Sequence, residues 1–358
     1  MRPTRKLLPV LPLAAMGAIA ALVYVSSGPV ATSSPTAGPS RTAEASPTAE
    51  ASPTAEPGLT AEPSQTATIA PTATKQPTAA TASRQPTAAA SCPIFPASNV
   101  WNRAVSGLAV AANSNAMIAA IGLDAYLHPD FDAVGDGIPY NVVSSSTPKY
   151  TVAFQYADES DPGPYPILSS PRIEKGSDRH MLMIDPGACM LYELYAVRKS
   201  GSSWSAGSGA VWDLRSNALR PAGWTSADAA GLPILPGLVR YEEVKAGAIY
   251  HALRFTAPDT CGYIYPARHL TAAPCSNLPP MGLRVRLKAS VDISGFGPQA
   301  RVVLTALKRY GMILADNGSP WYVTGTPDTR WNDDELHAFH QLTGADFEVV
   351  DTSGLRNG

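Results

Sequence analysis

The sequence predicts one mainly β domain, a β-sandwich or jelly-roll-like fold with two or three peripheral helices, behind an N-terminal part that does not fold. Composition changes sharply at Cys92, after which aromatic residues occur throughout. Short apolar segments separated by Gly, Pro and Asn then continue to the C-terminus, a pattern typical of all-β domains. The repeated strand–helix–strand alternation of a Rossmann or TIM fold does not occur.

The first 27 residues are typical of an export segment. Three basic residues lie within the first six, and Leu7 to Val25 is uncharged and mostly apolar. Its length falls between a cleavable signal region of about 7–15 residues and a membrane-spanning helix of about 17–25. Residues 1–27 are therefore expected to be a signal peptide or an N-terminal anchor. Both interpretations make the rest of the chain secreted or extracellular.

Residues 28–91 are expected to form a disordered linker. The segment is rich in Pro, Thr and Ala, and it repeats Ala43–Thr48 as Ala49–Thr54. It has almost no large apolar side chains, so nothing offsets the entropy lost on ordering it. Residues 92–358 should then form the globular domain, which we expect to be a monomer that touches a membrane only through an N-terminal anchor.

Charge and cysteine content restrict the partners and the compartment. The 27 Lys and Arg against 29 Asp and Glu give a net charge of −2, which argues against a nucleic-acid partner. An exported chain with four cysteines is expected to contain two disulfides. Of the three possible pairings, Cys261–Cys275 is the natural local bridge, and Cys92 would then pair with Cys189.

Alternating apolar residues and turn signals predict a series of strands and two hairpins. The expected strands are Tyr150–Tyr156, His180–Asp185, Cys189–Arg198, Ala210–Leu214, Ala248–Ala257, Gly262–Tyr265, Leu283–Ser290, Met312–Asp316, Trp321–Thr326 and Phe347–Val350. The Asp185–Ala188 turn predicts one hairpin, and Asn317-Gly318 between apolar segments predicts the other.

Helices are expected at three places. Residues 111–123 form one candidate, with Asn113 or Ser114 as the cap. Residues 298–310 begin with Pro298 and end before Gly311, which is typical of a helix. Residues 332–342 begin with Asn332 followed by three acidic residues, which favour a helix N-terminus.

The segment Gly223–Phe255 contains most of the candidate site. A loop punctuated by Gly and Pro leads into an expected strand that carries His251 and Arg254. His180, Glu193 and His251 would each lie on an otherwise apolar face of a strand, because alternate residues face the same side. Either each is satisfied singly, or they converge inside a concave sheet together with His269.

Converging groups would support one of two chemistries. A carboxyl such as Glu193 in an apolar setting would have a raised pKa and could protonate a glycosidic oxygen, with His251 beside it and Asp228 or Glu242 as base or nucleophile. This interpretation requires no cofactor. Alternatively, His180 and His269 could hold a divalent metal with Glu193 and His251, although the spacing matches no known metal motif.

Further polar and aromatic residues are candidates for substrate binding. Trp224, Tyr165 and Trp321 could stack on sugar rings, although such residues often fill β-sandwich cores, and Arg254 could bind a polar substituent. The acidic cluster of Asp158, Glu159 and Asp161 is interpreted as a solvated loop or an oxygen-rich calcium site.

Four strings together resemble a family of uncharacterised secreted bacterial proteins: GWTSADAAGLPILPGLVRYEEV, HALRF, ARH and YGMILADNGSPWY. The resemblance spans most of residues 92–351 and implies a single extracellular domain, but it implies no activity. The residues themselves favour a hydrolase that acts on an extracellular polysaccharide or a cell-envelope glycan. The alternatives are a non-catalytic glycan-binding module and a metal-dependent jelly-roll protein.

Overall fold

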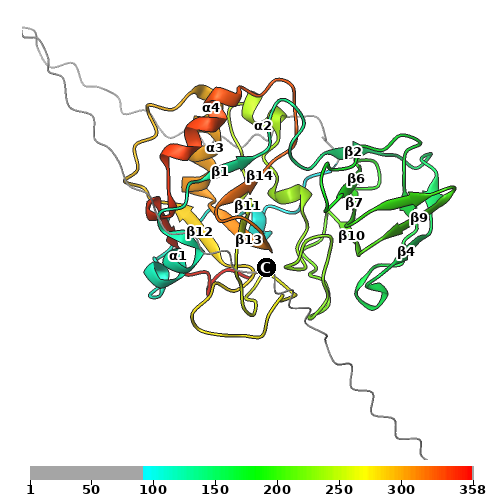
Figure 1. Ribbon diagram of the computed structural model, residues 1–358, viewed down its shortest axis with the longest axis horizontal. Coiled ribbons are helices and arrows are strands. Elements are labelled where there is room, and N and C mark those ends of the chain that lie inside the picture. The colour runs from blue at the N-terminus through cyan, green and yellow to red at the C-terminus, as the bar shows by residue number, and fades with distance from the viewer. Residues whose placement is uncertain (1–91, 357–358) are drawn as a thin grey trace, which may run out of the picture. The chain divides into compact units, whose positions relative to one another are not determined.

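A computed structural model of the protein describes Cys92 to Arg356, so the expectations for residues 1–27 and 28–91 lie outside the described residues. The described part is mainly β, with fifteen strands in four sheets and four α-helices (Figure 1), which confirms the predicted fold class. Among these residues no helix combines the length and apolar character needed to cross a bilayer.

The largest sheet has six strands and mixed directions. Its strands, in spatial order, are β1 (His128–Asp130), β14 (Tyr322–Thr324), β11 (Leu253–Ala257), β13 (Met312–Asn317), β12 (Arg284–Leu287) and β15 (Phe347–Val349). The pairs β1–β14 and β11–β13 are parallel, and the remaining pairs are antiparallel. Helices α1 (Ser114–Gly122), α3 (Pro298–Arg309) and α4 (Asp333–His337) lie beside this sheet (Figure 1).

Helix α3 forms where the pattern predicts it. Pro298 lies in the first turn, and Val303, Leu304 and Leu307 share a buried face. Gly311 follows the helix with φ +65°, and an added Cβ there would collide with the carbonyl oxygen of Val285. Glycine is therefore the residue that allows the chain to turn directly into β13.

A second sheet of four strands faces the first across a shared core. It contains, in spatial order, β10 (Gly209–Asp213), β7 (Met190–Leu194), β6 (Met181–Asp185) and β2 (Tyr140–Val142). Leu182, Leu191 and Trp212 on one face join the core that also includes the six-stranded sheet. Met183 and Leu194 belong to a separate, smaller core.

Two small sheets cover the outer face of the four-stranded sheet. One pairs β3 (Lys149–Tyr150) with β5 (Tyr165–Pro166), and the other orders β4 (Val152–Phe154), β9 (Ser203–Ala206) and β8 (Arg198–Ser200). Val152, Tyr165 and Trp204 from these strands fill the smaller core. The four-stranded sheet is therefore buried on both faces, which accounts for its dense apolar sequence.

One of the two predicted hairpins is confirmed and the other is wrong. Strands β6 and β7 pair antiparallel, with Asp185 opposite Met190. Strands β13 and β14, however, do not pair with each other, because β11 lies between them. The turn after Asn317 crosses the end of β11, where the Trp321 backbone N–H bonds to the Thr256 carbonyl at 3.2 Å.

Three other element predictions need correction. Strand β11 begins at Leu253, so the preceding residues 248–252, including His251, are not strand. Residues 262–265 contain only a bridge between Tyr263 and Met281. Strand β7 ends at Leu194, because Ala196 adopts φ 52°, which is incompatible with a continuous strand. The short helix α2 (Tyr241–Lys245) was not predicted.

Both disulfides have the favoured pairing. Cys92 bonds to Cys189 and ties the start of the domain to the turn before β7, and Cys261 bonds to Cys275 within one loop. No cysteine of the described residues is free. Two disulfides are typical of a protein in an oxidising environment outside the cytoplasm.

Candidate functional site

A loop between the two larger sheets forms the centre of the candidate site. We call residues Ser226–Leu235 the central loop. Its apolar residues Ala230, Leu232 and Ile234 are fully buried in the core that the two sheets share. A loop buried in this way must pair its backbone polar groups with the surrounding protein, and each neighbouring element supplies a partner.

The central loop first fixes its own shape. The Ser226 hydroxyl accepts a hydrogen bond from the Asp228 backbone N–H at 2.9 Å and donates one to the Leu232 carbonyl at 2.5 Å. Gly231 has φ +66°, and an added Cβ would lie 2.5 Å from the Trp224 carbonyl oxygen. The hydrogen bonds of Ser226 and the close approach of Gly231 to the Trp224 carbonyl keep the loop tightly folded.

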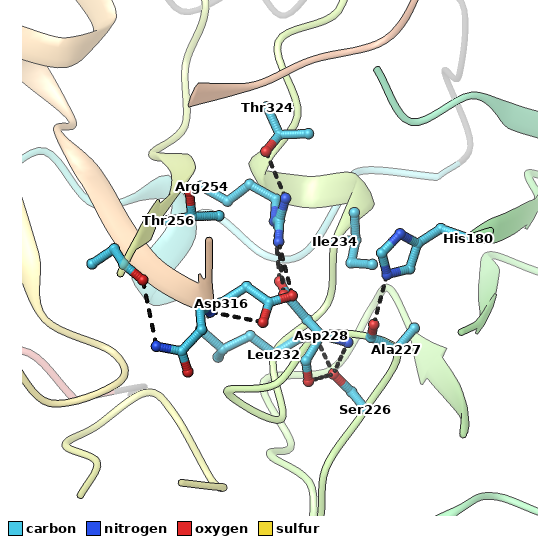
Figure 2. A network of polar contacts seen from close by, with 12 residues as sticks. His180, Ser226, Ala227, Asp228, Leu232, Ile234, Arg254, Thr256, Asp316 and Thr324 are labelled. Carbon is cyan, nitrogen blue, oxygen red and sulfur yellow. Dashed lines mark hydrogen bonds and ion pairs between the residues drawn. The ribbon is translucent and has the colours of Figure 1, made fainter. Parts of the chain in front are cut away.

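The ionisable residues predicted to converge on a shared hollow instead hold separate points of this loop. His180 Nε2 lies 3.0 Å from the Ala227 carbonyl (Figure 2), and His269 Nδ1 lies 2.8 Å from the Ala229 carbonyl. Glu193 accepts hydrogen bonds from the backbone N–H groups at the far end of the loop. The interpretation in which each group is satisfied by its own neighbours therefore describes most of this set.

Glu193 is fully buried and acts as a structural acceptor. Its carboxylate accepts the N–H groups of Ile234 at 3.0 Å and Leu235 at 2.9 Å and the indole N–H of Trp212 at 3.1 Å. Burial raises its pKa to about 7, although these hydrogen bonds oppose the shift. The raised pKa was predicted, but the side chain is 0% exposed and does not line the cavity described below.

Both ring nitrogens of His180 face acceptors, which favours the doubly protonated ring. Its Nδ1 lies 2.6 Å from a carboxylate oxygen of Glu174, and its Nε2 faces the Ala227 carbonyl, so both neighbours are acceptors. Burial alone would lower the pKa of His180, but the hydrogen bond and charge of Glu174 outweigh burial and raise it. The contact of this pair with Ala227 holds the central loop against the residue that precedes β6.

Asp228 is held by the buried arginine of β11. Arg254 Nε and Nη2 donate to the two Asp228 oxygens at 3.1 and 2.7 Å, and Nη1 donates to Thr324 Oγ1 at 2.6 Å (Figure 2). Such a bidentate pair is geometrically specific. Burial alone would lower the pKa of Arg254, but the charge and hydrogen bonds of Asp228 outweigh burial and raise it, so the guanidinium stays charged. Arg254 is only 3% exposed and does not line the cavity.

A cavity of about 410 Å³ opens beside the central loop. The cavity is lined by residues of the central loop and of several segments around it. They are Tyr156, Glu159, Asp178, Tyr195, Ser208, Thr225, Ser226, Ala227, Asp228, Ala229, His269, Asp316 and Asn317. Asp228 and His269 are therefore the two predicted site residues that the structure brings to one cavity.

Asp316 is the acidic group that the sequence did not single out. A β-bulge in the β11–β13 pairing leaves Ala315 unpaired in the ladder, and its carbonyl accepts the Ala230 N–H at 2.9 Å. The next residue, Asp316, then points towards Asp228 and Arg254 (Figure 2), with its Oδ2 3.7 Å from Arg254 Nη2. Burial raises the pKa of Asp316 well above its ordinary value, and the charge of Asp228 adds to the shift while Arg254 opposes it.

His269 and Glu159 lie together on the cavity wall. The Ala229 carbonyl fixes the His269 tautomer, since it requires the proton on Nδ1 and leaves Nε2 facing Glu159 at 3.7 Å. Glu159 also accepts the Thr225 backbone N–H at 2.9 Å. Neither partner is fully buried, with side-chain exposures of 26% and 36%.

Behind this wall, Arg220 holds the acidic cluster and Trp224 in place. It bonds to Asp161 Oδ2 and to the Thr225 carbonyl, and its guanidinium lies 5.5 Å from the Trp224 ring centroid. Of the predicted acidic cluster, Glu159 thus faces the cavity and Asp161 forms an ion pair. Trp224 stacks on Arg220 next to the cavity but does not line it.

Four other predicted site residues lie away from the cavity. Glu242 is on helix α2, 63% exposed, where it pairs with Arg330 at 2.7 Å. His251 contacts Glu243 at 3.1 Å and Arg240 at 3.0 Å. Trp321 and Tyr165 are each 0% exposed, so neither ring can stack on a sugar. The predicted role of Trp321 and Tyr165 as a sugar-binding surface is therefore wrong for this structure.

The proposed metal ligands are all engaged with protein groups. His180, Glu193, His251 and His269 have the separate partners described above, and the described residues contain no group of three or more His, Cys, Asp or Glu side chains arranged to hold a metal ion. A search of protein-family models, of curated proteins and of solved structures found no match to this chain.

Proposed function

We propose that the protein is an extracellular glycoside hydrolase that cleaves a polysaccharide by carboxyl acid–base chemistry in the cavity beside the central loop. The observation that carries this proposal is the position of Asp316, an acid with a raised pKa at the wall of an open cavity, next to the Asp228–Arg254 ion pair. A carboxylic acid whose pKa is raised holds its proton to higher pH and can protonate a glycosidic oxygen as the bond breaks.

The base in this chemistry would be the Glu159–His269 pair. Its fixed tautomer leaves His269 Nε2 able to accept a proton, and Glu159 stabilises the imidazolium that forms. A water molecule beside this pair would be activated for attack on the anomeric carbon. The remaining lining residues include the hydroxyl or amide groups of Tyr156, Thr225 and Asn317, which suit a ligand rich in hydroxyl groups.

The role of Arg254 is to position the acid pair and not to touch substrate. It forms a two-hydrogen-bond ion pair with Asp228, and the charge of Asp228 helps to raise the pKa of Asp316. The two carboxyls of this network thereby lie in different environments, since Asp228 is bound to the arginine at 2.7 Å and Asp316 lies 3.7 Å from it. The disulfides support secretion or surface attachment, which would bring this site to extracellular glycans.

Release of reducing ends from a panel of soluble and insoluble polysaccharides tests the proposal. Asp316→Asn keeps the shape of the side chain but cannot give up a proton, and we expect it to lower kcat by about 10²–10⁴-fold. The control is Asp334→Asn, which makes the same substitution at an exposed position on α4. Full activity of Asp316→Asn, or binding of a glycan by wild type without any cleavage, would contradict a hydrolase and favour a glycan-binding module.

A further inference from the structure

The charge of the cavity wall restricts the sugars that it can accept. Glu159, Asp178, Asp228 and Asp316 line it, and no lysine or arginine does so in the part of the chain that the structure describes. Arg254 forms an ion pair with Asp228 and lies 3.7 Å from Asp316, so its charge offsets that of these two carboxyls. Asp178 and Glu159 remain as negative charges facing the cavity.

These two carboxylates have few competing partners. Asp178 is exposed, and its carboxylate accepts only the Ser177 hydroxyl, at 3.3 Å, among the hydrogen bonds described. Glu159 accepts the backbone N–H of Thr225 and lies 3.7 Å from the imidazole of His269. Their negative charge is therefore available to a ligand, whereas the carboxylates of uronic acids or sulfate esters would be repelled.

Two tyrosine rings lie in the same cavity. Tyr156 is 48% exposed, and Tyr195 is half-buried beside it in the lining. Burial raises the pKa of Tyr195, and Asp178, Asp316 and the hydroxyl of Tyr156 add to that shift. Tyr156, Asp178 and Tyr195 line the same cavity. Aromatic faces next to carboxylates are the environment that binds ammonium groups.

We propose that the cavity selects glycans that carry free amino groups, with the ammonium of a 2-amino sugar held between the tyrosine rings and Asp178. This substrate class rests on the hydrolase function proposed above. Glu159, which also lines the cavity, contributes to the same negative field. The ligand must be extended enough to reach Asp316 as well, since both groups line one cavity.

The test compares β-1,4-linked oligomers of glucosamine and of N-acetylglucosamine of equal length at about pH 6, where the free amine is charged. Titration calorimetry is carried out with the Asp316→Asn protein, so that binding is measured without turnover. We expect the amine-bearing oligomer to bind about tenfold more tightly, and high salt to reduce the difference. Equal affinities at low salt would overturn the proposal.

Variants separate the charge from the aromatic contribution. Asp178→Asn should weaken binding of the amine-bearing oligomer about tenfold and leave the acetylated oligomer unchanged. Tyr156→Leu should weaken it about threefold. The matched control is Asp124→Asn, an exposed residue after α1 that does not line the cavity. Unchanged binding in Asp178→Asn, or an equal loss in Asp124→Asn, would overturn the assignment of Asp178.

The outcomes for the two proposals are distinguishable. Cleavage of the acetylated oligomer that depends on Asp316, without any preference for the amine, would retain the hydrolase and reject the amine selectivity. Binding of the amine-bearing oligomer that depends on Asp178, without cleavage by wild type, would reject the hydrolase and retain the ligand class.

Discussion

At the scale of single residues, the buried ion pair between Asp228 and Arg254 has the largest expected effect on stability. Both side chains are nearly inaccessible, at 1% and 3% exposure, and each has its charge satisfied almost entirely by the other. Removing one partner leaves the other charge buried without compensation, whereas removing both leaves only a packing defect. The pair therefore differs from the exposed ion pair of Glu242 and Arg330, which contributes little.

This difference gives a testable expectation. Arg254→Met should lower the free energy of unfolding by about 3–5 kcal/mol, because Asp228 would remain in the core as an unpaired carboxylate. The double variant Arg254→Met, Asp228→Leu should recover a substantial part of that loss. Urea unfolding measures both. A double variant that is no more stable than Arg254→Met would show that the loss comes from packing and not from charge.

At the scale of elements, the central loop is held by contacts from β7, β11 and β13 and from residues 180 and 269. Among these contacts the Glu174–His180 pair depends most clearly on pH. The hydrogen bond to His180 lowers the pKa of Glu174 although burial opposes it, and Glu174 in turn raises the pKa of His180. The carbonyl of Ala227 is bound to His180 only while its ring nitrogen carries a proton.

The pair should therefore stabilise the fold within a defined pH window. The contribution of His180 is fully present below its unfolded pKa of about 6.5 and is lost as pH rises through its raised folded pKa. That of Glu174 is present above its unfolded value and is lost as pH falls through its lowered folded pKa. Glu174→Gln should lower stability by about 1–3 kcal/mol near pH 5.5 and by clearly less near pH 9.

Denaturant unfolding of wild type and Glu174→Gln across that range provides the measurement. The relevant quantity is the difference between the two proteins at each pH, since other groups titrate in both. A difference that does not change from acid to alkaline pH would mean that the contact is an ordinary neutral hydrogen bond.

The described part of the chain as a whole is cross-linked by two disulfides that close loops of very different length. Cys92 and Cys189 are separated by 97 residues, whereas Cys261 and Cys275 are separated by 14. In the chain-entropy model a longer closed loop restricts the unfolded chain more strongly. The first bridge also fastens the start of the described residues to the second sheet, which the second bridge does not do.

Replacing Cys92 and Cys189 together by alanine should therefore cost about 4–5 kcal/mol of unfolding free energy, compared with about 3 kcal/mol for the Cys261–Cys275 pair. Unfolding in denaturant under oxidising conditions compares the two variants. Addition of a reductant to wild type should lower its stability by more than either variant loses. The reverse order of the two variants would show that native packing around Cys261 outweighs loop length.

Sequence patterns were sufficient where the determinants of structure are local. Helix α3 could be located from one proline, its apolar face and Gly311, and the β6–β7 hairpin from its turn. The placement of β11 between β13 and β14 could not be predicted from the sequence, because Asn317-Gly318 has the local signature of a hairpin whatever strand lies beside it. Local pattern carries no information about which distant segment completes a sheet.

The candidate site likewise combines residues that the sequence identified with one that depends on tertiary structure. Asp228 and His269 were identified because they lie in or near an unusual loop, but Asp316 resembled an ordinary polar residue at the end of a strand. Its role depends on a bulge at Ala315 and on the nearby charge of Asp228, and both arise from tertiary pairing. His180, Glu193 and His251 were expected on apolar faces and are buried, but the direction of the His180 and Glu193 hydrogen bonds towards the central loop could not be inferred from strand alternation.

The position of β11 between two strands that follow each other in the chain also has a consequence for biosynthesis. Strands β13 and β14 do not pair with each other. The middle of the sheet is therefore complete only when β11, which is synthesised earlier, has paired with both. Pairings between distant segments form slowly, because the chain must close long loops first. A nascent chain would therefore lack the ordered cavity around Asp316 until β14 has been synthesised and β11 has paired with both of its neighbours.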